Sequence, residues 1–196
     1  MAQNQQQITD RLPLRAGAVA GAASFVGGYL ITMAMVALSE TGELTSDLIQ
    51  ASGWLYYNAQ LADVELSVTS TGDSSGFGAL FDGITFNYVT DGSVFGESFS
   101  LQLPSVLYHL VPILCLGIAG FALARYVGSH TTQDGAIAGA TILAGTLPLS
   151  LLGTFLFTLE EDGTAIAPAL TESILFVGIF FPLFFGALGG ALSSRL

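Results

Sequence analysis

Long uncharged apolar blocks occur four times along the chain and are separated by polar segments. Residues 16–38, 110–124, 136–159 and 173–194 contain no Asp, Glu, Lys or Arg. A membrane-spanning helix needs about 20 mostly apolar residues at a rise of about 1.5 Å each. All four blocks meet this length once residues 105–109 are added to the second. Because no amphipathic helices remain to cover such blocks in water, the pattern predicts an all-α transmembrane bundle of four helices.

The positively charged side chains predict how this bundle is oriented. Arg11 and Arg15 precede the first span, Arg125 closes the second and Arg195 closes the fourth. With four spans all of them lie on one side, which the arginine excess of cytoplasmic loops identifies as the cytoplasm. We therefore expect a multi-pass protein of the cell membrane with both termini cytoplasmic and residues 1–15 as an N-terminal tail.

A glycine-spaced stretch occurs twice. Residues 17–28 read GAVAGAASFVGG and residues 135–146 read GAIAGATILAGT, with six identical positions out of twelve. In each case a returning helix with a glycine pair and a final arginine follows. We interpret this as a tandem duplication of one helical hairpin, residues 16–38 with 104–127 and then residues 133–192. The alternative is a chance resemblance between spans rich in Gly and Ala.

Glycines four residues apart are typical of helices that pack closely in a membrane. Lipid provides no hydrophobic force between helices, so van der Waals contact between small residues must hold them together. The alternative is the general enrichment of glycine in membrane spans. The predicted packing glycines are Gly17, Gly21, Gly120, Gly135, Gly139, Gly186 and Gly190.

Three spans also contain a proline. Each proline removes one helical hydrogen bond and frees the carbonyl group four residues earlier. The prolines are Pro112, Pro148 and Pro182, and the freed carbonyl groups belong to Tyr108, Ala144 and Gly178.

Residues 39–103, between the first two spans, are too long for a plain connector. Within them, residues 45–60 carry apolar side chains at helical spacing and predict a helix. Its Trp54, Tyr56 and Tyr57 are aromatic residues of the kind that settle among lipid headgroups. We therefore expect this helix to lie along the membrane surface.

Three further segments alternate apolar and polar residues as strands do, namely 64–69, 84–88 and 99–103. The pair Asp91-Gly92 is typical of a two-residue hairpin turn. We expect a three-stranded antiparallel sheet. Together with the helix it makes residues 39–103 a small extracytoplasmic α+β insertion.

The amino-acid composition and the absence of known motifs exclude several classes of function. The chain has 15 acidic residues, four arginines, no lysine and a net charge of −11, so a nucleic-acid partner is excluded for lack of a basic patch. Without lysine no Schiff-base cofactor can form. No nucleophile elbow, HExxH helix, P-loop or dinucleotide fingerprint is present, and we expect no cofactor and no metal. The single cysteine, Cys115, lies in the middle of a span, so no intramolecular disulfide forms.

This acidic, lysine-free composition on four spans resembles that of small four-span membrane proteins of haloarchaea whose function is unknown. The resemblance is one of composition only. It implies a halophilic cell membrane as the setting and assigns no role to any residue.

His109 and Glu172 are the only acidic or basic side chains inside the spans away from the arginine-marked ends. By helical rise both lie about 6–8 Å below the outer ends of their spans. If the hairpins are duplicates, the two residues occupy corresponding positions and face one another. Such a pair can carry a proton or hold a cation. The alternative is that both reach the outer membrane surface and have no function.

Three functions compete on this evidence. A scaffold or accessory subunit of the cell envelope, which presents the acidic outer module to a protein partner, fits the scarcity of polar groups in the spans. A small-solute or ion transporter, acting alone or as a homo-oligomer, fits the parallel repeat and the prolines in the spans. An intramembrane enzyme is the third, and no residue pattern supports it.

Overall fold

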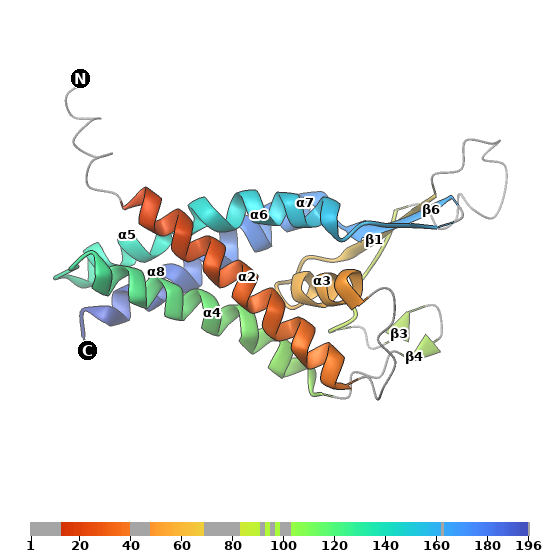
Figure 1. Ribbon diagram of the computed structural model, residues 1–196, viewed down its shortest axis with the longest axis horizontal. Coiled ribbons are helices and arrows are strands. Elements are labelled where there is room, and N and C mark those ends of the chain that lie inside the picture. The colour runs from red at the N-terminus through yellow and green to blue at the C-terminus, as the bar shows by residue number, and fades with distance from the viewer. Residues whose placement is uncertain are drawn as a thin grey trace, which may run out of the picture. The chain divides into compact units, whose positions relative to one another are not determined.

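The computed structural model describes residues 13–39, 48–68, 83–90, 93–94, 97–98, 103–161 and 163–195 (Figure 1). The chain forms two compact units, each assembled from segments far apart in the sequence. The bundle unit comprises Met1–Gly28, Pro112–Leu149 and Gly178–Leu196. The sheet unit comprises Tyr29–Val111 and Ser150–Val177.

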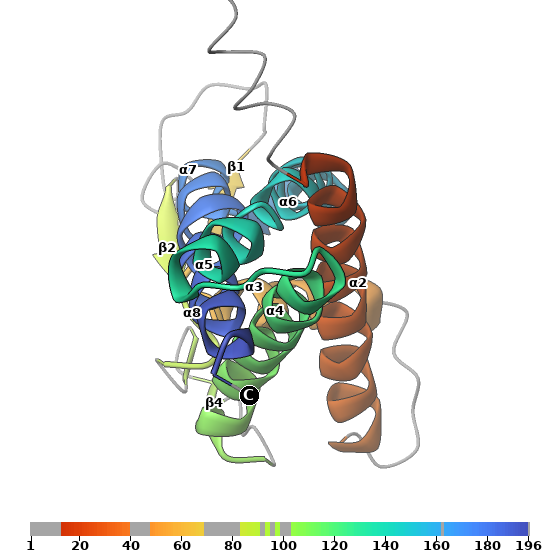
Figure 2. The same cartoon turned by 90° about the vertical axis from the view of Figure 1, so that its left-hand side faces the viewer.

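Among the residues that the structure describes, four helices are long and apolar enough to cross a membrane, which confirms the prediction of four such helices (Figures 1 and 2). The first is α2 (Leu14–Ser39) and the second is α4 (Ser105–Tyr126). The third consists of α5 (Thr132–Ala140) and α6 (Leu143–Leu156). The fourth consists of α7 (Leu170–Glu172), the π-helix η2 (Ser173–Phe180) and α8 (Phe181–Ser193).

The third span breaks between α5 and α6, at Thr141 and Ile142. The Thr141 hydroxyl donates to the carbonyl oxygen of Ala138 at 2.6 Å, and the Thr141 amide donates to the same oxygen at 3.1 Å. Such a bond from a threonine side chain back to its own helix competes with the regular ladder and bends the helix. The Ile142 amide accordingly bonds three residues back, to Gly139 O at 3.3 Å.

The fourth span widens into its π-helix just before Pro182. This proline cannot donate to Gly178 O, so that carbonyl group loses its helical partner. Thr146 of α6 supplies a replacement, because its hydroxyl lies 3.3 Å from Gly178 O. Thr146 is 1% exposed, so the two spans share a buried polar contact at the proline.

Backbone contact at glycines joins α2 to the broken third span. A Cβ atom on Gly17 would collide with Thr141, and one on Gly21 would collide with the carbonyl oxygen of Ile142. From the other side, a Cβ atom on Gly145 would collide with the carbonyl oxygen of Ala18. Both helices therefore have glycine at the contact, and a larger residue on either of them would push the two helices apart.

α8 packs in the same way against two helices (Figure 2). Against α5, Gly139 lies on Gly186 O, while Gly135 and Gly190 lie on each other's carbonyl oxygens. Against α4, Gly120 also lies on Gly186 O. All seven glycines that the sequence singles out for packing thus lie against atoms of a neighbouring helix.

The two copies of the repeated stretch make different contacts. In the second copy, Gly135 and Gly139 face the returning helix of their own hairpin, α8. In the first copy, Gly17 and Gly21 face the break in the third span rather than α4. Packing in the two hairpins is therefore not equivalent, and the duplication stays a prediction from the sequence.

The sheet differs from the expected one. Its strand order is β2-β1-β6-β5, with all neighbours antiparallel. Only β1 (Val64–Val68) and β2 (Ile84–Phe86) come from the segment between the first two spans. The other two, β5 (Leu159–Glu161) and β6 (Thr164–Pro168), come from the connection between the third and fourth spans. The prediction of a three-stranded sheet confined to residues 39–103 was wrong, because the second connection supplies half of the described sheet.

The predicted hairpin at Asp91-Gly92 also changes. Val89 and Thr90 lie in a turn, and Ser93–Val94 (β3) instead pairs with Glu97–Ser98 (β4). Asp91, Gly92 and most of the expected strand 99–103 lie outside the described residues. A separate cluster gives the sheet unit its small apolar core: Val36, Leu55, Ala59, Val89 and Tyr108.

Replacing Gly21 or Gly139 by alanine is expected to lower the free energy of unfolding by about 1–3 kcal/mol, because the new methyl group overpacks a helix contact. Gly27 and Gly117 are matched controls, since a Cβ atom there meets nothing within 4 Å. Alanine at the control positions should be neutral or stabilising by up to about 1 kcal/mol through helix propensity. Thermal melting in detergent measures all four, and equal shifts would contradict the packing argument.

Candidate functional site

The helix α3 (Leu48–Asn58) is held inside the sheet unit by its aromatic side chains. The Trp54 indole donates to Phe157 O at 2.8 Å, and the Tyr57 hydroxyl donates to Ser150 O at 2.6 Å. Trp54, Tyr56 and Tyr57 are 7%, 1% and 0% exposed. These aromatic residues therefore pack within the protein, and the expectation that they rest among lipid headgroups was wrong.

Burial raises the pKa of the Tyr57 hydroxyl, and a hydrogen bond with Thr154 lowers it to a smaller degree. The group therefore keeps its proton at neutral pH and remains a donor to Ser150 O. This contact joins α3 to the end of the third span without introducing a charge.

The end of α3 has an unusual backbone conformation. Leu61 has a φ of +63°, the left-handed region that glycine normally occupies after a helix. Two bonds close the turn, from the Leu61 amide to Asn58 O at 3.0 Å and from the Ala62 amide to Tyr57 O at 3.1 Å. This is the hydrogen-bond pattern of a Schellman motif. It turns the chain sharply from α3 towards β1.

His109 and Glu172 both hold this turn. His109 Nδ1 lies 2.8 Å from Ala59 O, and because a carbonyl oxygen only accepts, Nδ1 carries the proton. Glu172 Oε2 accepts from the Asp63 amide at 2.6 Å. The two spans that carry these residues therefore bind positions 59 and 63 of one short segment.

An asparagine network lies beside these contacts. Asn58 donates to Ala62 O at 2.9 Å and accepts from the Tyr88 amide at 2.9 Å. Asn87 donates to Asp63 Oδ1 at 3.0 Å and accepts from two amides of the following turn. Asn58 is 0% exposed and Asn87 is 4% exposed, so the network is internal to the sheet unit.

The expected His109–Glu172 pair does not form. Among the described residues each of the two bonds a backbone group of the turn, and neither bonds the other. The same part of the chain contains no group of three His, Cys, Asp or Glu side chains able to hold a metal ion. The arrangement can therefore fix the α3–β1 turn to two spans.

The sequence pattern did not identify Asn58 and Asn87 as important. Both are buried side chains with several hydrogen bonds, which is how a polar group becomes tolerable inside a protein. The available signal was weak: asparagine at the end of a predicted helix and after a predicted strand indicates a turn.

The geometry defines a class: a helical bundle with four spans of membrane-crossing length, whose connections form a sheet fixed to the spans by buried polar contacts. Within that class the chain belongs to a family of unknown function (DUF7978), whose model matches residues 1–196. No curated protein and no solved structure matches the chain.

Removing the Glu172 acceptor should loosen the turn. Glu172→Ala is expected to cost about 1–3 kcal/mol of stability, because the half-buried Asp63 amide loses its partner. Glu172→Gln keeps an acceptor oxygen and should cost much less. Hydrogen exchange at the Asp63 amide measures the effect locally. If Ala and Gln protect this amide equally, the contact does not hold the turn.

Leu61→Gly is expected to stabilise the protein by about 1 kcal/mol, because glycine occupies the left-handed region without the Cβ clash of leucine. Leu61 is 46% exposed, so little packing is lost. Leu61→Ala is the matched control, since it shortens the side chain and keeps the clash. A thermal melt in which alanine and glycine behave alike would show that backbone strain is not the cause.

Proposed function

We propose that this protein is a scaffold of the cell membrane. Four spans anchor the extracytoplasmic insertion of residues 39–103, both termini are cytoplasmic, and this insertion binds a protein partner. The observation that carries the proposal is the use of His109 and Glu172. These are the acidic and basic side chains that a transporter would need inside its spans. Both are instead hydrogen-bonded to the backbone of the α3–β1 turn.

The hydrogen bonds at Gly178 and at the break in the third span also favour a scaffold. A transporter with broken helices uses the freed backbone groups to hold its substrate. Here Gly178 O accepts from Thr146, and the Thr141 hydroxyl bonds back to its own helix. These contacts favour a rigid anchor over a transport pathway.

The charge of the insertion at residues 39–103 indicates the chemistry of its partner. Residues 16–124 contain no Lys or Arg, while nine acidic residues lie between positions 39 and 103. A surface of one sign attracts a partner of the other sign and repels its own kind. We therefore infer a partner with a basic surface. The edge strand β2, on which Thr85 is exposed, is a natural place for contact.

A cross-linking experiment tests this function, because the chain has no lysine. In a Cys115→Ala background, Thr85→Cys should react with an impermeant maleimide from outside intact cells. His130→Cys should react only after permeabilisation. An impermeant thiol-to-amine cross-linker at Thr85→Cys should then give one discrete adduct whose mass exceeds that of the chain by the mass of a second protein, because the chain offers no lysine and its N-terminal amine lies inside. Labelling of His130→Cys from outside overturns the orientation, and absence of an adduct overturns the scaffold.

Flux measurements provide the opposing test. Purified protein in liposomes should move neither ions nor small solutes, and His109→Asn should behave like wild type. Flux that both His109→Asn and Glu172→Gln abolish, without loss of thermal stability, would replace the scaffold by a transporter.

A further inference from the structure

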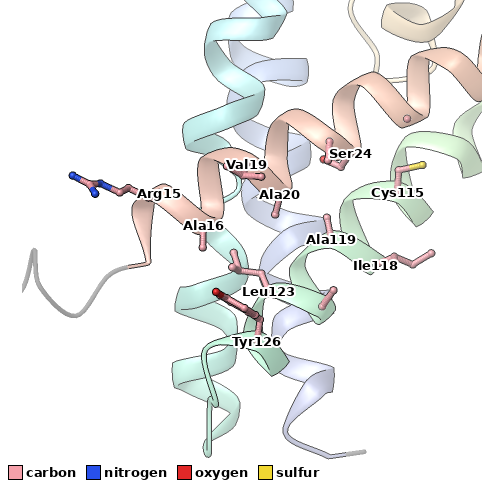
Figure 3. A pocket seen from close by; sticks show the side chains of 13 residues that line it. Arg15, Ala16, Val19, Ala20, Ser24, Cys115, Ile118, Ala119, Leu123 and Tyr126 are labelled. Carbon is pink, nitrogen blue, oxygen red and sulfur yellow. The ribbon is translucent and has the colours of Figure 1, made fainter.

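An apolar groove of about 840 Å³ lies within the bundle unit, between α2 and α4 (Figure 3). This volume is within the range of roughly 300–1,000 Å³ found for pockets that hold small molecules. The lining positions on each helix recur every three or four residues, so each helix contributes one continuous face. Small residues dominate the α2 wall, with Ala16, Ala20, Ala23 and Gly27. The α4 wall combines Ala119 and Ala122 with the larger Ile118, Leu123 and Tyr126.

The groove occupies a position in the first hairpin at which the second hairpin has direct contact between its two helices. In the second hairpin, Gly135 and Gly139 of α5 bring the backbone directly onto α8. In the first hairpin the matching glycines of α2 face the third span, and the adjacent face of α2 lines the groove. A Cβ atom on Gly27 would meet nothing within 4 Å, so the wall is open at that point.

One end of the groove is polar and carries the charge, while the remainder is mostly apolar and includes Ser24, whose hydroxyl donates to Gly21 O within α2. Arg15 and Tyr126 lie at this end, and Figure 3 shows the Arg15 side chain extending beyond the end of α2. The chain has a net charge of −11 and four arginines, and one of these arginines, Arg15, lines this end of the groove. A positive end and an apolar remainder match an amphiphile with an anionic head.

We propose that the groove binds one anionic phospholipid, with acyl chain along the alanine-rich walls and phosphate at the Arg15 guanidinium. The proposal rests on the membrane-spanning position of α2 and α4, which is part of the proposed function. At membrane depth an open apolar groove is filled by whatever surrounds it, and arginine at the headgroup level pairs with phosphate.

A lipid fits this groove better than a fifth helix. Helices that pack through small residues need their backbones to approach closely. Val19 and Ile118 also line the groove, and they are 71% and 66% exposed. Their branched side chains project from the walls and keep a second backbone away, whereas a flexible acyl chain passes between them.

Native mass spectrometry of the purified protein tests the proposal, with phosphatidylglycerol and phosphatidylcholine of identical acyl chains as probes. One phosphatidylglycerol should bind about fivefold more tightly than phosphatidylcholine, as expected from roughly 1 kcal/mol per arginine at a membrane surface. Arg15→Gln should remove this preference and leave phosphatidylcholine binding unchanged. Equal binding of both lipids to wild type would overturn the assignment of the headgroup.

Leucine substitutions that fill the groove provide a second test of the lipid site. Ala20→Leu and Ala119→Leu should lose the bound lipid, while Ala37→Leu, an exposed position on α2 outside the groove, should keep it. A phosphatidylglycerol with a photoreactive acyl chain should cross-link to α2 and α4 peptides of wild type, which does not depend on how the variants fold. Cross-links spread over all spans, or a dimer that Ala20→Leu dissociates, would overturn the site.

Retention in the membrane fraction after alkaline carbonate extraction separates the two proposals. A protein that is retained but shows no lipid preference contradicts the lipid site alone. A protein that is released contradicts the membrane position and therefore both.

Discussion

Direct contact between helix backbones is the interaction on which the bundle unit depends. In the membrane position that we propose, lipid tails are as apolar as leucine side chains, so burying leucine between spans gains little. What remains is dispersion, which requires close approach, and close approach requires residues without a Cβ atom. Gly186 shows the consequence most clearly, because Gly120 of α4 and Gly139 of α5 both lie on its carbonyl oxygen. The position of α8 is thereby determined by three glycines from three helices.

The sheet unit is held by a different kind of contact. Its anchor is a set of hydrogen bonds to the α3–β1 turn, made by His109 from the second span and Glu172 from the fourth. An ionisable group inside a span is costly unless it is paired, and backbone groups of a sharp turn offer suitable partners. The left-handed Leu61 belongs to the same arrangement, because the turn must place positions 59 and 63 towards different spans. Polar side chains that suggested transport are therefore used to fix the turn.

The sequence predicted the features that depend on local pattern and missed those that depend on long-range pairing. Four spans and seven packing glycines follow from hydropathy and spacing, and Thr146 satisfies a carbonyl group that Pro182 was expected to free. The prediction of the sheet was wrong because the partners of a strand can come from anywhere in the chain. Asp162-Gly163 carries the same turn signal in the sequence as Asp91-Gly92, and Gly163, with a φ of +78°, lies directly before β6. The acidic run before Gly163 hid β5, because charge runs usually indicate a solvated loop.

The asymmetry of the repeat connects packing to binding. Two helical hairpins with the same glycine spacing could pack in the same way, and here they do not. The glycines of α2 lie against the break at Thr141 and Ile142 in the third span, and within the bundle unit an open groove lies between α2 and α4. Without direct packing between α2 and α4 the protein loses dispersion energy, unless another molecule fills the groove and makes these contacts. In the membrane position that we propose, the bound phospholipid would supply these contacts, and Arg15 would select an anionic headgroup.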